Sequence, residues 1–137
     1  MDARRVSSRP FLRPHTPSTA RRWLPGIAWS VVILVITSVP GSAIPAGPEI
    51  PGLDKVVHAT MYGVLGFLVG NALLRERVAA WVLAGGVIAV MAAGDEWHQE
   101  WIPGRSAETL DWVADVAGAT VGLTLSRAAH ARRETRS

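Results

Sequence analysis

The chain of 137 residues has room for one domain. It contains no cysteine, which excludes disulfides and cysteine-ligated zinc. Charged residues make up 18% of the sequence, below the roughly 25% of soluble domains, and long uncharged stretches separate them. The net charge of +3 would suit a nucleic-acid partner only if the basic residues were gathered on one folded surface, and their distribution along the chain indicates otherwise.

The amino-terminal part of the sequence changes from basic to apolar. Residues 1–22 contain six arginines and three prolines without helical periodicity, which predicts a disordered cytoplasmic tail. The apolar run Leu24–Val39 reaches the lower limit of a membrane span, about 17 residues, only with its flanking residues. Pro25 suits the first turn of such a helix. A signal peptide cleaved near residues 41–43 is the alternative, but the apolar runs that follow favour an uncleaved first span.

Three further apolar runs follow a proline-rich loop at residues 40–54. They cover residues 56–74, 78–94 and 110–126. The second of them has no polar stripe, as expected of a buried or lipid-facing helix, and so short a chain cannot bury four such helices in its own core. The sequence therefore predicts an all-α membrane protein, a bundle of about four transmembrane helices over residues 23–126, followed by a basic cytoplasmic tail at 127–137.

Charge is divided between the two sides of this predicted bundle. The two tails and the middle turn carry twelve arginines and three acidic residues, whereas the first and third loops with their flanking helix ends carry two basic and eight acidic residues. Because basic segments stay in the cytoplasm, we expect a multi-pass protein of the cell membrane with both termini inside. The arginines then serve as topology signals that attract anionic membrane lipids, and no nucleic-acid partner is expected.

Polar side chains gather where three of the predicted helices reach the outer side. Asp54, His58 and Tyr62 recur every four residues and therefore share one helix face. The other members lie beside them on the second helix, at the end of the third, in the loop that follows it, or at the start of the fourth: Lys55, Asp95, Glu96, Gln99, Arg105, Asp111 and Asp115. Ionisable groups at membrane depth pair with one another and mark a functional site by default. The alternative interpretation, a structural network that joins the helix ends, has equal weight for these residues.

The same residues resemble the VanZ-like family. Its pattern, D-K-x-x-H…Y, D-E-x-x-Q…P-G-R and D-x-x-x-N-x-x-G, is similar to residues 54–66 (DKVVHATMYGVLG), 95–106 (DEWHQEWIPGRS) and 111–122 (DWVADVAGATVG). The resemblance covers residues 24–126. It implies a small multi-pass membrane protein, and the founding member of the family is associated with low-level resistance to the glycopeptide antibiotic teicoplanin. One departure is Asp115, where the family commonly has asparagine.

Two functions of different classes fit these residues. In the first, the protein binds a cell-envelope or lipid-linked anionic ligand at its extracytoplasmic face and needs no cofactor or metal. Arg105 would contact the anion, because its planar guanidinium pairs with phosphate or carboxylate, while Asp54, His58 and Asp111 orient the ligand.

The alternative is an intramembrane enzyme that acts on an envelope lipid or peptide. His58 or Glu96 would be the general base, and a metal held by these and neighbouring carboxylates is conceivable. The sequence offers no clear nucleophile and no H-E-x-x-H motif, which favours the binding function. The glycine pairs at 66 and 70 and at 118 and 122 leave a homo-oligomer open.

Overall fold

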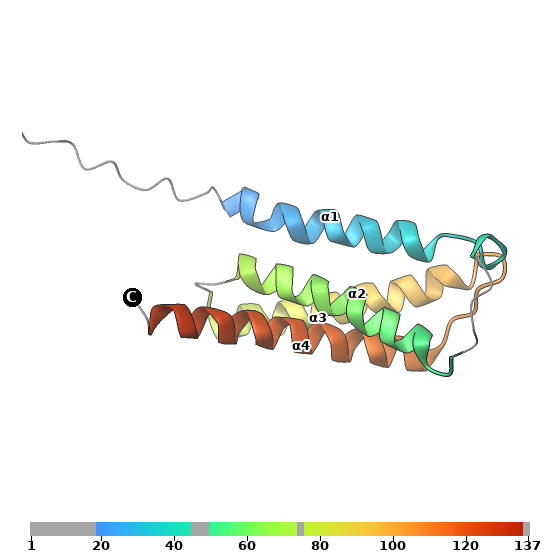
Figure 1. Ribbon diagram of the computed structural model, residues 1–137. Helices are drawn as coiled ribbons and strands as arrows, with labels where there is room; N and C mark the ends of the chain where they lie inside the picture. The colour runs from blue at the N-terminus through green and yellow to red at the C-terminus, as the bar shows by residue number, and fades with distance from the viewer. Residues whose placement is uncertain (1–18, 45–49, 74–75, 136–137) are drawn as a thin grey trace, which may run out of the picture.

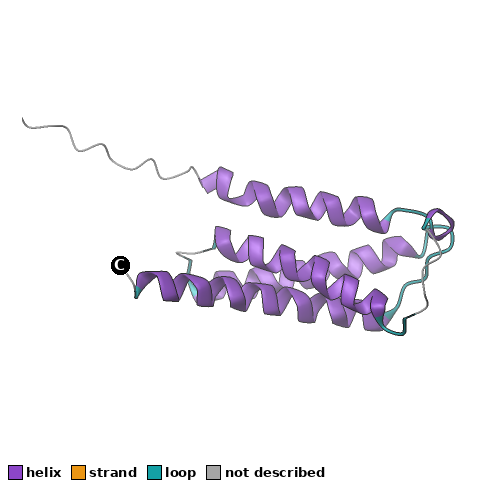
Figure 2. Ribbon diagram, in the orientation of Figure 1, coloured by secondary structure: helices purple, strands orange, loops and turns teal. Residues whose placement is uncertain are grey.

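The computed structural model describes residues 19–44, 50–73 and 76–135, so residues 1–18 of the predicted amino-terminal tail lie outside it. These residues form four α-helices and one short 3-10 helix. They are α1 (Thr19–Thr37), η1 (Gly41–Ala43), α2 (Leu53–Ala72), α3 (Val78–Gln99) and α4 (Thr109–Glu134). Figure 2 shows no strand among the described residues. The predicted all-helical bundle is confirmed.

Two of the helices, α1 and α3, are long and apolar enough to cross a membrane by length and composition. Only 17% of the residues in each of these two spans are buried. Apolar side chains such as Val82 and Val90 on α3 point outward, with 71% and 74% of their surface exposed. Such an apolar surface suits contact with lipid tails. α2 and α4 fall short of the same test because polar side chains interrupt them, and they run alongside α1 and α3 in one bundle (Figure 1).

Glycines let α2 and α4 pack with their backbones in contact. A methyl group added to Gly118 would overlap the carbonyl oxygen of Ala59. One added to Gly66 would overlap the carbonyl oxygen of Ala119, and Gly122 lies equally close to the α2 backbone. The small residues that left a homo-oligomer open are therefore used within the chain, and they no longer argue for association between copies.

The first helix is part of the bundle. Ile33 is buried in the core, and the indole nitrogen of Trp29 donates a hydrogen bond of 2.8 Å to the carbonyl oxygen of Met61 on α2. After the helix, the backbone nitrogen of Gly41 donates to the carbonyl oxygen of Pro103 at 3.0 Å. Removing α1 would therefore expose groups that are buried in the core of the bundle.

Three helix boundaries differ from the prediction. α1 begins five residues before the predicted Leu24, so Pro25 lies inside the helix, where its missing N–H removes one backbone hydrogen bond. α3 continues beyond Gly94 because the polar residues that follow are buried against other helices. α4 continues past the predicted end at Ser126, since alanine and arginine favour helix and basic side chains stabilise its carboxyl end. Most of the predicted tail at 127–137 is therefore helical.

The up-and-down order of the helices separates the charges. The start of α1, the end of α2, the start of α3 and the end of α4 lie together at one end of the bundle (Figure 1). The opposite end holds the end of α1, η1, the start of α2, the end of α3 and the start of α4. We call the first the basic end and the second the acidic end, after the residues that each carries. All three sequence motifs reach the acidic end.

Candidate functional site

The innermost group at the acidic end joins α2, α3 and α4. His58 Nδ1 lies 3.1 Å from Asp115 Oδ1 and 3.6 Å from Glu96 Oε1. All three residues are buried, and Asp115 has no exposed surface. The second oxygen of Asp115, Oδ2, has no hydrogen-bond partner among the described residues. A buried polar atom without a partner is costly, so this oxygen calls for an explanation.

The carboxylate of Glu96 is held from two sides. Its Oε2 accepts a hydrogen bond of 3.0 Å from the backbone nitrogen of Glu108, the residue that precedes α4. Its Oε1 is 3.5 Å from Nε2 of Gln99, one turn further along α3 and also buried. The start of α4 thus fixes an acidic side chain of α3, which explains why the polar end of α3 stays helical.

A second group ties α1 to α2 and α3 through Asp95. Thr37 Oγ1 donates a hydrogen bond of 2.7 Å to Asp95 Oδ1, and the Tyr62 hydroxyl donates to Oδ2 at 3.4 Å. All three side chains are buried. Sequence reasoning missed Thr37, because a threonine in an apolar helix most often bonds back to its own helix. The Ile33 carbonyl oxygen does lie 3.0 Å from Thr37 Oγ1, but the single hydroxyl proton serves the shorter contact with Asp95.

The third group surrounds the ammonium of Lys55. Its Nζ lies 2.6 Å from Asp54, 2.8 Å from Glu108 and 2.9 Å from Asp111. The lysine therefore joins the starts of α2 and α4 and neutralises part of the acidic end. Three of the residues predicted to bind a ligand, Asp54, Lys55 and Asp111, are engaged with one another. Glu108, which the sequence analysis left out of the site, completes this group.

Arg105 lies between the α3–α4 connection and the end of α1. Its Nε donates to the carbonyl oxygen of Val39 at 3.2 Å, and Nη2 donates to that of Ile36 at 3.4 Å. The Ile36 carbonyl also accepts a backbone hydrogen bond from Val39 at 3.2 Å, so the guanidinium adds a second donor there and ties the end of α1 to the α3–α4 connection. Nearby, His98 Nε2 lies 3.0 Å from Ser38 Oγ, which shows that His98 points toward α1.

A groove of about 1000 Å³ opens beside these groups, between the end of α1, η1 and the start of α2. Its walls are mainly apolar. The apolar side chains include Ile36, Val39, Ile50, Val57 and Met61, and the polar ones are Thr37, Asp54, His58 and Arg105. His58 therefore connects the groove with the buried group around Asp115. We call this cavity the acidic-end groove.

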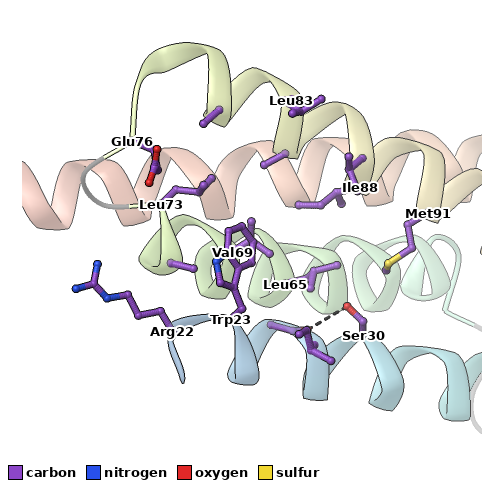
Figure 3. A pocket seen from close by; sticks show the side chains of 16 residues that line it. Arg22, Trp23, Ser30, Leu65, Val69, Leu73, Glu76, Leu83, Ile88 and Met91 are labelled. Atoms are coloured by element: carbon purple, nitrogen blue, oxygen red, sulfur yellow. Dashed lines mark hydrogen bonds between the residues drawn. The ribbon is translucent and has the colours of Figure 1, made fainter. Parts of the chain in front are cut away.

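A second groove, of about 560 Å³, lies among α1, α2 and α3 (Figure 3). Leu65, Val69 and Ile88 line it, with Arg22 and Glu76 toward the basic end. No residue of the predicted site lines it.

Tyr62 and Asp95 line a third cavity, of about 500 Å³, beside α1 and α3. The acidic-end groove is lined by three predicted site residues, Asp54, His58 and Arg105.

A helical bundle with outward apolar helices and one buried polar end is the architecture of a helical membrane protein. The VanZ/LLP1 family profile matches residues 9–130, and the chain belongs to this family. The family resemblance predicted from the three motifs is confirmed, and the match extends beyond residues 24–126 on both sides. No curated protein and no solved structure matches the chain.

Proposed function

We propose that this protein binds a lipid-linked cell-envelope ligand with an anionic head group in the acidic-end groove. The groove carries the proposal, because apolar walls with a few convergent polar groups are typical of sites for amphiphilic small molecules. The apolar walls would take the lipid chain. The polar groups, Arg105 and His58 above all, would take the head.

Charge distribution supports Arg105 as the contact for the anion. The ammonium of Lys55 is already within 2.9 Å of three carboxylates, which leaves it little attraction for a ligand. Arg105 bonds only to backbone carbonyls among the described residues, and these carry no net charge. A guanidinium has five N–H donors, so part of it can still bind phosphate while it caps α1.

The proposal places the acidic end outside the cell and both termini in the cytoplasm. Its support is the gathering of arginines at the basic end, since basic segments are retained on the cytoplasmic side. A ligand of the cell envelope would then reach the acidic-end groove from outside or from the outer leaflet. Membrane lipids would surround the apolar faces of α1 and α3.

Binding can be measured with the full chain in lipid nanodiscs and a long-chain polyprenyl phosphate as the probe. We expect Val57→Trp to weaken binding at least tenfold, because residue 57 lines the groove and the larger ring fills it. Val56→Trp is the matched control, since the neighbouring residue lies outside the groove lining. Equal binding by the Val57→Trp protein, or equal binding of the uncharged polyprenol, would refute the proposal.

Family membership extends the proposal to glycopeptide resistance. We expect expression of the wild-type chain to raise the teicoplanin concentration that inhibits growth, and the Val57→Trp chain at equal abundance to do so less. The Val56→Trp chain should behave as wild type. Resistance that is indifferent to a filled groove would separate the phenotype from this site.

An intramembrane enzyme is the competing function, and one observation favours it. Asp115 holds the imidazole of His58 at 3.1 Å, which is how a carboxylate orients a general base. Glu96 Oε1 lies 3.6 Å from the same nitrogen. Mass spectrometry of the polyprenyl phosphate after incubation would decide between the two: a product formed by the wild type and absent with Glu96→Gln would replace binding with catalysis.

A further inference from the structure

We infer that His58, Glu96 and Asp115 bind one divalent transition-metal ion, for which Zn²⁺ is the best-suited occupant. Each residue offers one ligand atom, and these atoms all lie within 4.8 Å of one another. Imidazole nitrogen and carboxylate oxygen are ligands that zinc accepts. The sequence analysis expected no metal for the binding function and left one open only for an enzyme. It did not single out these three ligands, because they come from three helices and form no linear motif.

The distances between the ligand atoms fit a metal ion. Ligands about 2.1 Å from a tetrahedral zinc ion stand about 3.4 Å from one another. His58 Nδ1 is 3.1 Å from Asp115 Oδ1 and 3.6 Å from Glu96 Oε1, so the two separations lie on either side of that value. These two separations are therefore close to the spacing that a tetrahedral ion requires, and all three ligand atoms lie within 4.8 Å of one another.

The unpartnered oxygen of Asp115 points to a ligand more directly. A proton on His58 Nδ1 can serve Asp115 Oδ1 only, which leaves Oδ2 buried without a partner and Glu96 Oε1 beyond hydrogen-bond length. A divalent ion in place of that proton contacts both carboxylates at once, and binding through both oxygens of Asp115 would give Oδ2 the partner that it lacks. The ion also balances the two negative charges, which are expensive to bury without compensation.

The surroundings of Glu96 are also those of a metal ligand. Its outer oxygen accepts the 3.0 Å hydrogen bond from the Glu108 backbone, which fixes the direction of the carboxylate, as outer-shell partners of metal ligands do. The other acidic group at this end, Asp54, Glu108 and Asp111, differs in one respect: Lys55 already occupies its centre. The described residues provide no such cation for Asp115 beyond His58.

The test measures metal content and affinity in the full chain, purified in detergent and treated with a chelator. We expect one Zn²⁺ per chain on calorimetric titration, and Co²⁺ to give the visible absorption of a tetrahedral N/O site. Asp115→Asn should lower the affinity at least thirtyfold, because the amide keeps the size and the acceptor for His58 but loses the charge. Glu108→Gln is the matched control, since its side chain is acidic, lies at the same end and is outside the three ligands.

Two results would overturn the inference. One is a wild-type chain, with the helical circular dichroism of a folded protein, that takes up no stoichiometric Zn²⁺ or Co²⁺. The other is an Asp115→Asn chain that binds the ion as tightly as the Glu108→Gln control. Both readouts are independent of the polyprenyl phosphate probe, so they separate the metal site from the proposed ligand groove.

Discussion

Asp95 is the residue that anchors α1 to the polar end of the bundle. Its two oxygens accept hydrogen bonds from Thr37 on α1 and from Tyr62 on α2, so one side chain joins three helices. Because the shorter of these bonds, at 2.7 Å, is the one from Thr37, the threonine hydroxyl is the stronger partner.

We predict that Thr37→Val lowers the free energy of unfolding by about 1 kcal/mol, the usual scale of a side-chain hydrogen bond between membrane helices. Valine has nearly the same shape, so the loss reports the hydroxyl. Thermal unfolding in detergent micelles measures it. Thr60→Val is the matched control, because the Thr60 hydroxyl is exposed and bonds only to the Val56 carbonyl of its own helix. Equal loss in both variants would contradict the assigned role of Thr37.

Sequence spacing predicted which residues share a face and could not predict their partners. Asp54, His58 and Tyr62 do lie along one side of α2, but they reach Lys55, Asp115 and Asp95 respectively. Four residues advance a helix by about 6 Å, so each of the three sits at a different depth. Asp54 pairs with its own neighbour in the sequence. The acidic partners of His58 and Tyr62 depend on how α3 and α4 are placed, and no local pattern encodes that placement.

At the level of the helices, α2 and α4 pack closely because glycines, which have no side chain, lie in the contact between them. Four apolar runs were enough to predict four helices, since a helix that faces lipid must be apolar over most of its length. In the sequence the glycine pairs only left a homo-oligomer open, and their partners within the chain became known from the structure. Gly118 faces the Ala59 carbonyl and Gly66 faces that of Ala119, so each helix supplies the space for the other.

We predict that Gly118→Ala destabilises the bundle by about 1–3 kcal/mol, the usual cost of overpacking. The new methyl group would overlap the Ala59 carbonyl, which is backbone and cannot rotate away. Gly86→Ala is the matched control, because a methyl group there has no neighbour within 4 Å. Unfolding midpoints of the two variants in the same detergent give the comparison. A Gly118→Ala protein as stable as the Gly86→Ala protein would contradict the packing of α2 on α4.

For the molecule as a whole, the order of the helices brings charges of the same sign to the same end of the bundle. The basic segments are far apart in the sequence, yet the bundle brings the described ones to the same end (Figure 1). The acidic motifs come together at the other end, where Asp95, Glu96 and Asp115 are buried. Which side chains pair at each depth became known only from the structure. The division of charge between two ends was already predictable from the positions of the charged residues in the sequence.

The absence of cysteine allows a direct test of the proposed orientation. We predict that a single cysteine at Ser42, exposed at the acidic end, reacts with a membrane-impermeant maleimide on intact cells. A single cysteine at Thr135, exposed at the basic end, should react only after the membrane is permeabilised. The physical reason is that twelve arginines favour the cytoplasmic side for the basic end. The reverse pattern of labelling would place the groove and the buried acids in the cytoplasm, and an envelope ligand could then no longer reach them from outside.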